Sequence, residues 1–117
     1  MIKENYYGDG SKTSSYKIIY NPETKEAKEE IHFWTNGIKK CETAYDDITG
    51  VRTKRNDYDR EGKLIVETTY NSNGTTKKEI AHNNDGSKNI IEYHEDGTLN
   101  KEIKCLPNGQ VIERIAQ

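Results

Sequence analysis

The sequence has few of the residues that build a large apolar core or a disulfide framework. Its 117 residues include two cysteines, two prolines, one tryptophan and one phenylalanine. Ile, Leu, Val and Phe together number 20 of the 117 residues. This share is below the level of about a fifth of the chain at which strongly charged chains stay disordered. Here 18 basic residues nearly balance 20 acidic ones, and eight tyrosines add surface that can be buried. We therefore expect one folded domain, residues 1–117, with a thin core.

These absences exclude several classes of protein. There is no apolar run of roughly 18 residues, so no membrane-spanning helix is expected, and the amino terminus lacks the apolar stretch of a signal peptide. Cys41 and Cys105 are too few for a disulfide scaffold and do not form a paired metal motif. A net charge of −2 gives no overall attraction to nucleic acid or to membranes. The default expectation is a cytoplasmic protein, or a secreted one if a leader has been removed.

The sequence does contain an internal repeat of about 12 residues. Glycines lie at positions 10, 37, 50, 62, 74, 86, 97 and 109, and the spacings after Gly37 are 13, 12, 12, 12, 11 and 12. Asn or Asp precedes six of these eight glycines. This pattern is typical of hairpin turns, because glycine takes a positive φ without a steric clash. Near Lys25 the stretch NPETKE supplies a proline-led turn instead. We expect type I turns closed by a glycine bulge, with antiparallel strands between them.

The segments between the turns are rich in Ile, Thr, Tyr and Val, which suit an extended chain. They read SYKIIY, EEIHFW, CETAY, KLIVETTY, KKEIAH, KNIIEY and NKEIK. No helix of ordinary length fits, because a turn arrives about every twelfth residue. The sequence therefore predicts an all-β fold, an antiparallel meander of about eight or nine short strands in an open or curled repeat sheet. A small closed β-barrel is the alternative. It would remove exposed strand edges, but it requires more apolar side chains to fill its interior. A partner or a second copy that completes the sheet is a third arrangement.

Ring-bearing residues recur eight positions after the glycines. The column contains Tyr45, Tyr58, Tyr70, His82, His94 and Cys105, with Tyr20 and Trp34 in similar places. Successive strands of a meander run in opposite directions, so this column alternates between the two edges of the sheet. Two ladders follow, Tyr45–Tyr70–His94 and Tyr58–His82–Cys105. The glutamates at 42, 67, 79 and 102 also share one register, where cross-strand ion pairs on a solvated face are expected.

No set of catalytic or metal-binding residues emerges from the sequence. His82 and His94 belong to neighbouring strands but to opposite edges, so they should not converge on a metal. The loops NNDGS and HEDGT resemble pieces of calcium loops, but they lack the terminal bidentate glutamate. Cys41 and Cys105 have no motif of a catalytic nucleophile, and a thin sheet offers no water-excluded cleft for acid–base chemistry. We expect no enzyme activity, no cofactor and no metal site.

The most basic stretch is VRTKRNDYDR, residues 51–60. It places Arg52 and Arg55 near Tyr58, and basic residues around an aromatic ring can hold single-stranded nucleic acid. Four nearby aspartates weaken the positive field. Nucleic acid is therefore not the expected partner, and a solvated strand is the simpler interpretation.

Three stretches of the repeat resemble a known family. They are HFWTNGIKKCETAYDDITGVRTK, YDREGKLIVETTYNSNG and YHEDGTLNKEIKCLPNGQ. They are similar to the variant MORN-type repeats of bacterial proteins, often labelled antitoxin- or immunity-like, and YDDITG and YDREGK also resemble the YD repeats of large secreted Rhs shells. The resemblance covers about residues 31–115. The second glycine pair of the full MORN pattern is missing, and an Rhs shell needs many more repeats. The resemblance implies a β-repeat scaffold for protein contacts, with no catalytic residues to carry over.

Together these features predict a non-enzymatic protein-binding module that inhibits or neutralises an enzyme or a toxin. The expected contact residues are of the types that dominate protein interfaces. They are Trp34, Tyr45, Tyr58, Tyr70, Arg52 and Arg55. Strand addition at an unpaired edge is a second route to binding. The alternatives are a phage-type, anti-CRISPR-like inhibitor of a nucleic-acid-processing defence enzyme, and a structural or surface repeat fragment. A homo-oligomer is a further expectation, and a membrane is not an expected partner.

Overall fold

The computed structural model describes residues 2–6, 14–46 and 48–115, with only the backbone of residues 2–6 and 14. The predicted turn at Gly10 lies outside these residues. The described chain forms ten strands in a single sheet. The strands are β1 (Ile2–Tyr6), β2 (Ser14–Tyr20), β3 (Ala27–Phe33), β4 (Lys39–Tyr45), β5 (Arg52–Tyr58), β6 (Leu64–Tyr70), β7 (Thr76–His82), β8 (Lys88–Tyr93), β9 (Leu99–Cys105) and β10 (Val111–Ile115).

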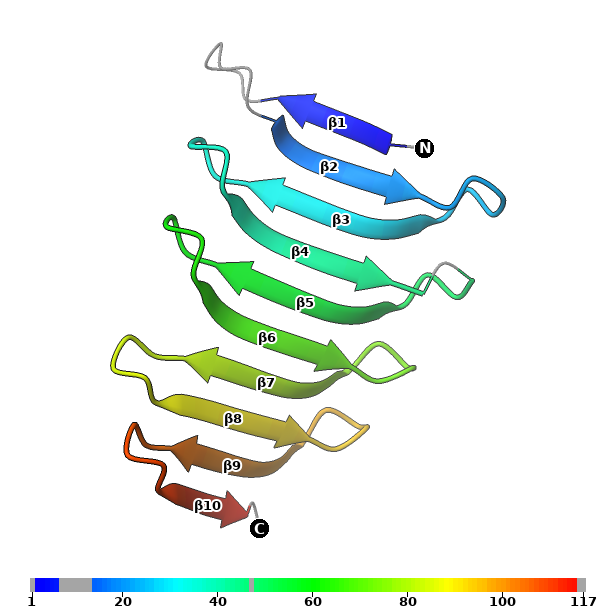
Figure 1. The fold of residues 1–117 in the computed structure, drawn as a ribbon. Coiled ribbons are helices and arrows are strands. Elements are labelled where there is room, and N and C mark those ends of the chain that lie inside the picture. Colours follow the sequence, from blue (N-terminus) through cyan, green and yellow to red (C-terminus); the bar gives the residue numbers. More distant parts are fainter. Residues whose placement is uncertain (1, 7–13, 47, 116–117) are drawn as a thin grey trace.

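The strands lie in the sheet in the order that they have in the chain (Figure 1). Every neighbouring pair is antiparallel. The predicted all-β meander is therefore confirmed, with ten strands instead of eight or nine because short strands also pair at both ends. β1 and β10 occupy opposite ends of the strand order, so the sheet is open and the closed alternative is not realised.

The turns have the hydrogen bonds of a type I turn closed by a glycine bulge. In the β3–β4 turn the Gly37 N–H donates to the Trp34 carbonyl at 3.0 Å, and the Trp34 N–H donates to the Ile38 carbonyl at 2.8 Å. The same pair of bonds recurs at glycines 62, 74, 86, 97 and 109. These glycines have φ between 86° and 90°, and Lys25 takes a φ of 66° in the turn that lacks a glycine. The predicted turn type is confirmed.

Small insertions explain the uneven spacing of the glycines. The β4–β5 turn is one residue longer than the other turns closed by a glycine, since the Gly50 N–H donates to Asp46, four residues earlier, as the Lys25 N–H does to Asn21 in the β2–β3 turn. Most strand pairs also contain a bulge. Asp57 and Tyr58 pair with Val66 and Leu64, which leaves one extra residue in β6. The β7–β8 pair has no bulge, so β8 is one residue shorter and the next spacing is 11.

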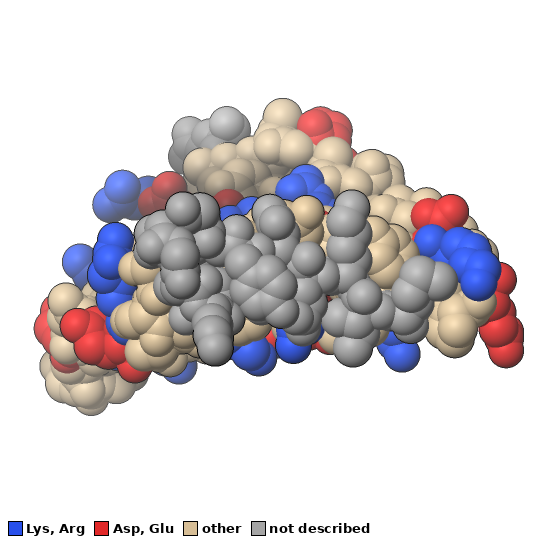
Figure 2. Space-filling model, turned by 90° about the horizontal axis from the view of Figure 1, so that it is seen from above, with Lys and Arg blue, Asp and Glu red and all other residues tan. Residues whose placement is uncertain are grey.

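The sheet is a single layer with a thin core. Among the described side chains, the buried apolar ones are Ile31 and Cys41, with 8% and 6% of their surface exposed. The Cα positions extend over 47 × 33 × 19 Å, and the outline is arched when seen from above, with basic and acidic side chains side by side (Figure 2). Ladder hydrogen bonds and cross-strand side-chain pairs therefore supply much of the stability. The described residues contain no helix that could span a membrane.

Candidate functional site

The sheet presents two faces of different chemistry. Directly opposed residues of antiparallel strands point to the same face, and successive residues of one strand point to opposite faces. One face carries the cross-strand row Glu30, Thr43, Arg55 and Thr68. The other face carries the row Ile31, Glu42, Asn56 and Glu67. We call the first the arginine face and the second the glutamate face.

A ring-bearing column runs along the last residues of the strands. These last residues, from β2 to β9, are Tyr20, Phe33, Tyr45, Tyr58, Tyr70, His82, Tyr93 and Cys105. The column alternates between the two edges of the sheet, as predicted. Two predicted members were wrong, because Trp34 and His94 each begin the following turn, where their N–H groups donate to Ile38 and Thr98. Phe33 and Tyr93 take their places.

The two ladders also lie on opposite faces. Tyr45 and Tyr70 come two residues after threonines of the arginine face, so they share that face. Tyr58 comes two residues after Asn56 and lies on the glutamate face. The glutamates that were predicted to share one register also divide between the two faces. Glu79 is opposed to Thr68 on the arginine face, whereas Glu67 lies on the glutamate face.

Rings of the column bond to acidic side chains on the preceding strand. The Tyr45 hydroxyl donates to Glu30 Oε2 at 3.1 Å, and the Tyr58 hydroxyl donates to Glu42 Oε1. His82 Nε2 lies 2.9 Å from Glu67 Oε2. Each ring therefore reaches diagonally across one strand spacing, which joins neighbouring strands through side chains as well as through the backbone ladder.

A shallow groove lies on the arginine face across β3, β4 and β5. It has a volume of about 310 Å³. Its lining residues are Glu30, His32, Lys40, Cys41, Thr43, Tyr45, Arg52 and Arg55. Cys41 and Thr43 are buried, with 6% and 7% of their surface exposed, and form its floor between longer side chains. Burial is the main cause that raises the pKa of the Cys41 thiol, so this cysteine stays protonated and is a poor nucleophile.

Arg52 connects the groove to the tyrosine ladder. It is opposed to Tyr45 in the β4–β5 pair, and its guanidinium carbon lies 4.3 Å from the centre of the Tyr70 ring. This cation–π contact does not itself use the N–H groups of Arg52 as hydrogen-bond donors to an oxygen. Arg52 is exposed, and no carboxylate of the described residues lies within 4.0 Å of its nitrogens. Within residues 15–46 and 48–115, no carboxylate therefore occupies the N–H groups of Arg52, and they can bond to a partner.

Arg55 is held more firmly than Arg52. Its Nη2 lies 3.0 Å from Asp57 Oδ1, and its Nε donates to both oxygens of the same carboxylate at 3.2 and 3.3 Å. Hydrogen bonding to Asp57, followed by the charge of that carboxylate, raises the pKa of Arg55 despite partial burial. Arg55 therefore contributes a fixed position and a largely balanced charge.

Glu30 orders the opposite wall of the groove. Its two oxygens receive the Tyr45 hydroxyl at 3.1 Å and face His32 Nε2 at 2.7 Å. Burial, followed by the hydrogen bond to Glu30, raises the pKa of Tyr45, so its hydroxyl remains a neutral donor. With Lys40, Arg52 and Arg55 against Glu30 and Asp57, the groove and its border have a small excess of positive charge.

Two of the six predicted contact residues lie elsewhere. Trp34 sits in the β3–β4 turn, where Lys40 Nζ and the Arg60 guanidinium carbon lie 5.0 and 4.6 Å from its ring centre. Its indole nitrogen is buried and has no hydrogen-bond partner among the described residues. Tyr58 lies on the glutamate face, bound to Glu42. The structure thus brings together Tyr45, Tyr70, Arg52 and Arg55, while Trp34 and Tyr58 are separate from them.

The groove contains residues that sequence reasoning did not select. They are Glu30, His32, Lys40, Cys41 and Thr43. Neither their residue types nor their spacing in the sequence distinguishes these residues from the rest of the chain. Only the cross-strand register places them around Tyr45 and Arg52. In the described part of the chain, no three His, Cys, Asp or Glu side chains are placed to hold a metal ion. The chemistry of the groove is that of noncovalent binding through rings, guanidinium groups and one ordered carboxylate.

Comparison with known proteins gives no functional assignment. No family model matches the chain, and no curated protein is significantly similar to it. One solved structure, described as a GtfA/B complex bound to UDP and GlcNAc, aligns with a TM-score of 0.38 and 14% sequence identity. The alignment covers 99% of this chain but only 24% of that chain. A similarity of this size carries no argument about function.

Proposed function

We propose that this chain is a non-enzymatic protein-binding module that inhibits or neutralises a protein partner, an enzyme or a toxin, through its arginine face. The observation that carries this proposal is the grouping of Tyr45, Tyr70, Arg52 and Arg55 around one open groove. Tyrosine and arginine are enriched among the residues that dominate the energetics of interfaces. Each of these four side chains already has a contact with a neighbouring side chain, so less conformational entropy is lost on binding.

The protonation states of the groove favour recognition over bond-making. Burial keeps the Cys41 thiol protonated, and burial with Glu30 keeps the Tyr45 hydroxyl neutral. Neither group is an activated nucleophile or base near neutral pH. The resemblance of the repeat to MORN-type antitoxin- and immunity-like proteins supports the neutralising role. Two free cysteines fit a reducing, cytoplasmic setting.

The N–H groups of Arg52, which no carboxylate of the described residues occupies, point to the chemistry of the partner. A guanidinium group that stacks on a ring can still bind a carboxylate with two parallel hydrogen bonds. We therefore expect the partner to place an aspartate or glutamate against Arg52 and an aromatic or aliphatic side chain against Tyr45.

The test compares partner capture by three forms of the protein. The wild-type chain, a Tyr45→Ala/Arg52→Ala variant and an Arg60→Ala control are used as bait in an extract of the source cell. The captured partner is then purified for calorimetry and for an assay of its own activity. Arg60 is a matched control, because it also stacks on a ring but lies outside the groove.

We expect the double variant to bind at least about tenfold more weakly, a loss of about 1.4 kcal/mol, and the control to bind normally. Stoichiometric wild-type protein should inhibit the partner. Equal binding by all three forms would contradict the proposal, as would turnover of a small molecule with no protein partner. Binding to a nuclease that weakens steeply with salt would favour the anti-CRISPR-like alternative.

A further inference from the structure

The last strand, β10, carries an unusual amount of exposed apolar surface. All five of its residues are exposed, and Val111, Ile112 and Ile115 have 60%, 48% and 67% of their surface accessible. Five large apolar side chains are exposed in the described part of the chain, and these are three of them. Apolar surface that is gathered on one strand marks a contact site more often than scattered apolar residues do.

The outer backbone edge of β10 is also unpaired. The Leu106 N–H donates to the Gln110 carbonyl in the preceding turn, which sets the alternation of hydrogen bonds along the strand. Ile112 and Arg114 therefore turn their backbone groups toward β9. Val111, Glu113 and Ile115 turn theirs outward, where no strand of residues 2–6, 14–46 or 48–115 lies. Such an edge is a template for another strand.

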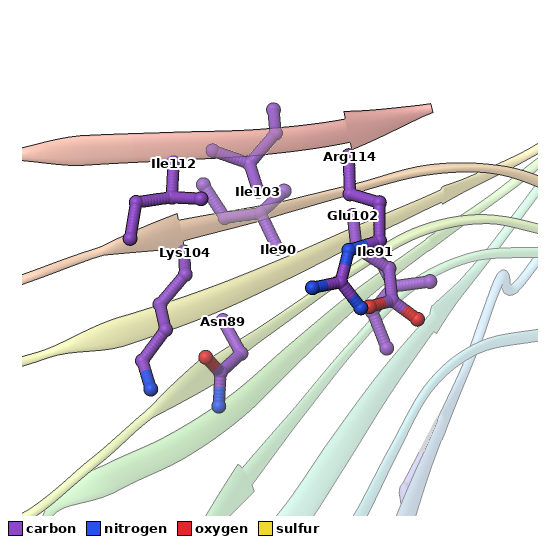
Figure 3. Close-up of a pocket in the computed structure, with 8 residues that line it drawn as sticks. All are labelled: Asn89, Ile90, Ile91, Glu102, Ile103, Lys104, Ile112 and Arg114. Atoms are coloured by element: carbon purple, nitrogen blue, oxygen red, sulfur yellow. The ribbon is translucent and has the colours of Figure 1, made fainter. Parts of the chain in front are cut away.

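A hollow on the arginine face adjoins this edge (Figure 3). Its volume is about 460 Å³, and it extends across β8, β9 and β10. Its apolar lining includes Ile91 and Ile112, and Glu102, Lys104 and Arg114 supply charged groups. Because β10 forms one border, a strand added to β10 would cover Ile112 and lengthen the hollow.

We propose that β10 pairs with β10 of a second copy of this chain, forming a dimer with one continuous twenty-stranded sheet. A two-fold axis perpendicular to the sheet generates an antiparallel pair with the same face on both sides. The register with Glu113 on the axis pairs all five residues of both strands, whereas a shift leaves residues unpaired. In this register Val111 lies opposite Ile115 twice, so the two most exposed apolar side chains of β10 cover one another.

The charges of β10 are compatible with this register. The two Glu113 side chains would face each other, but each already has Lys101 Nζ at 3.2 Å. The same Lys101 Nζ lies 3.4 Å from Glu92 Oε2, so the lysine is held in place by two carboxylates. Two lysines thus flank the two central carboxylates and offset their repulsion. Pairing through one strand buries less surface than a standard interface, so the dimer should be weak and concentration-dependent.

Sedimentation equilibrium of the full chain tests the proposal. From micromolar to millimolar concentration, the wild-type mass should rise from 13.5 kDa toward twice that value. Ile115→Lys should abolish the rise, because the added charges would oppose the apolar contacts. Ile48→Lys is the matched control, since Ile48 is 84% exposed in the β4–β5 turn and far from β10 in sequence. The control should dimerise like the wild type.

Oxidative cross-linking tests the register independently of stability. In a hydrogen-bonded antiparallel pair the Cα atoms are about 5.5 Å apart, within the range of about 4.4–6.8 Å that a disulfide spans. Glu113→Cys should therefore form a covalent dimer that is absent from the wild type, and Arg114→Cys should form much less. A monomer at millimolar concentration, association that persists in Ile115→Lys, or equal cross-linking at both positions would overturn the proposal.

Discussion

The guanidinium carbon of Arg52, at the start of β5, lies 4.3 Å from the centre of the Tyr70 ring at the end of β6. Adjacent strands run in opposite directions, so the first residue of one strand and the last of the next meet at the same edge of the sheet. The contact joins the basic groove to the tyrosine ladder of the arginine face.

The Arg52–Tyr70 contact should be measurable as a coupling energy. Tyr70→Phe keeps a ring for the cation, so the free energy of unfolding should change by less than about 0.5 kcal/mol. Tyr70→Leu removes the ring, and a double-mutant cycle of Tyr70→Leu with Arg52→Ala should give a coupling of about 0.5–1 kcal/mol. Urea unfolding provides all four values. Additive effects of the two substitutions would show that the contact contributes no stability.

The tyrosines that bond to glutamates should make the fold sensitive to alkali. Burial, followed by hydrogen bonding to Glu30 and Glu42, raises the pKa values of Tyr45 and Tyr58 above 10.0. A raised pKa in the folded state contributes stability that is complete below the ordinary pKa and is lost as the pH rises through the folded value. The free energy of unfolding should therefore fall above about pH 10.

A Tyr45→Phe/Tyr58→Phe variant checks this assignment. Its stability at neutral pH should be lower by about 1–3 kcal/mol, because two hydrogen bonds are lost. Its dependence on pH above 10 should be flatter than that of the wild type, with Cys41 unchanged in both proteins. An equal slope in both proteins would assign the alkaline sensitivity to other groups.

The aspartates of the turns should give sensitivity to acid. The Ser87 hydroxyl and backbone N–H donate to Asp85, and those of Thr98 donate to Asp96, which lowers both pKa values below 3.8. A lowered pKa contributes stability that is present above the ordinary value and is lost as the pH falls through the folded value. An Asp85→Asn/Asp96→Asn variant keeps the acceptor oxygens but cannot titrate there. Its urea midpoint should fall less than the wild-type midpoint between about pH 6 and pH 2, whereas parallel losses would disprove the assignment.

Asparagines connect turns at the same edge of the sheet. Asn73 Nδ2 donates to the Glu95 carbonyl at 3.0 Å, while its Oδ1 accepts the Thr75 N–H at 3.0 Å. Asn73→Asp removes only the first bond and places a negative charge near a carbonyl oxygen, so it should cost about 1–2 kcal/mol. Asn108 holds the equivalent turn position and accepts the Gln110 N–H, but it has no later turn to bond among the described residues. Asn108→Asp should be nearly neutral in the same unfolding assay, and equal costs would contradict the turn-to-turn role of Asn73.

The glycine spacing alone was enough to predict the order of the strands, their antiparallel pairing and the type of turn between them. A positive φ every dozen residues forces a reversal, and a chain that reverses so often has no room for a helix. The same reasoning placed Tyr45 and Tyr58 at opposite edges, since it needs only the direction of each strand. The lack of apolar residues likewise favoured an open single layer over a filled interior.

Which face each side chain occupies was decided only by the tertiary structure. Side chains alternate with a period of two, so one extra residue in a bulge or turn moves all later residues to the other face. The missing bulge of the β7–β8 pair shortens one glycine spacing to 11, but neither that spacing nor the composition tells which face a side chain occupies. Glu42 and Glu79 therefore share a position in the repeat but lie on different faces. For the same reason, Arg52, Tyr45 and Glu30 could be seen as one site only after the strands were in register.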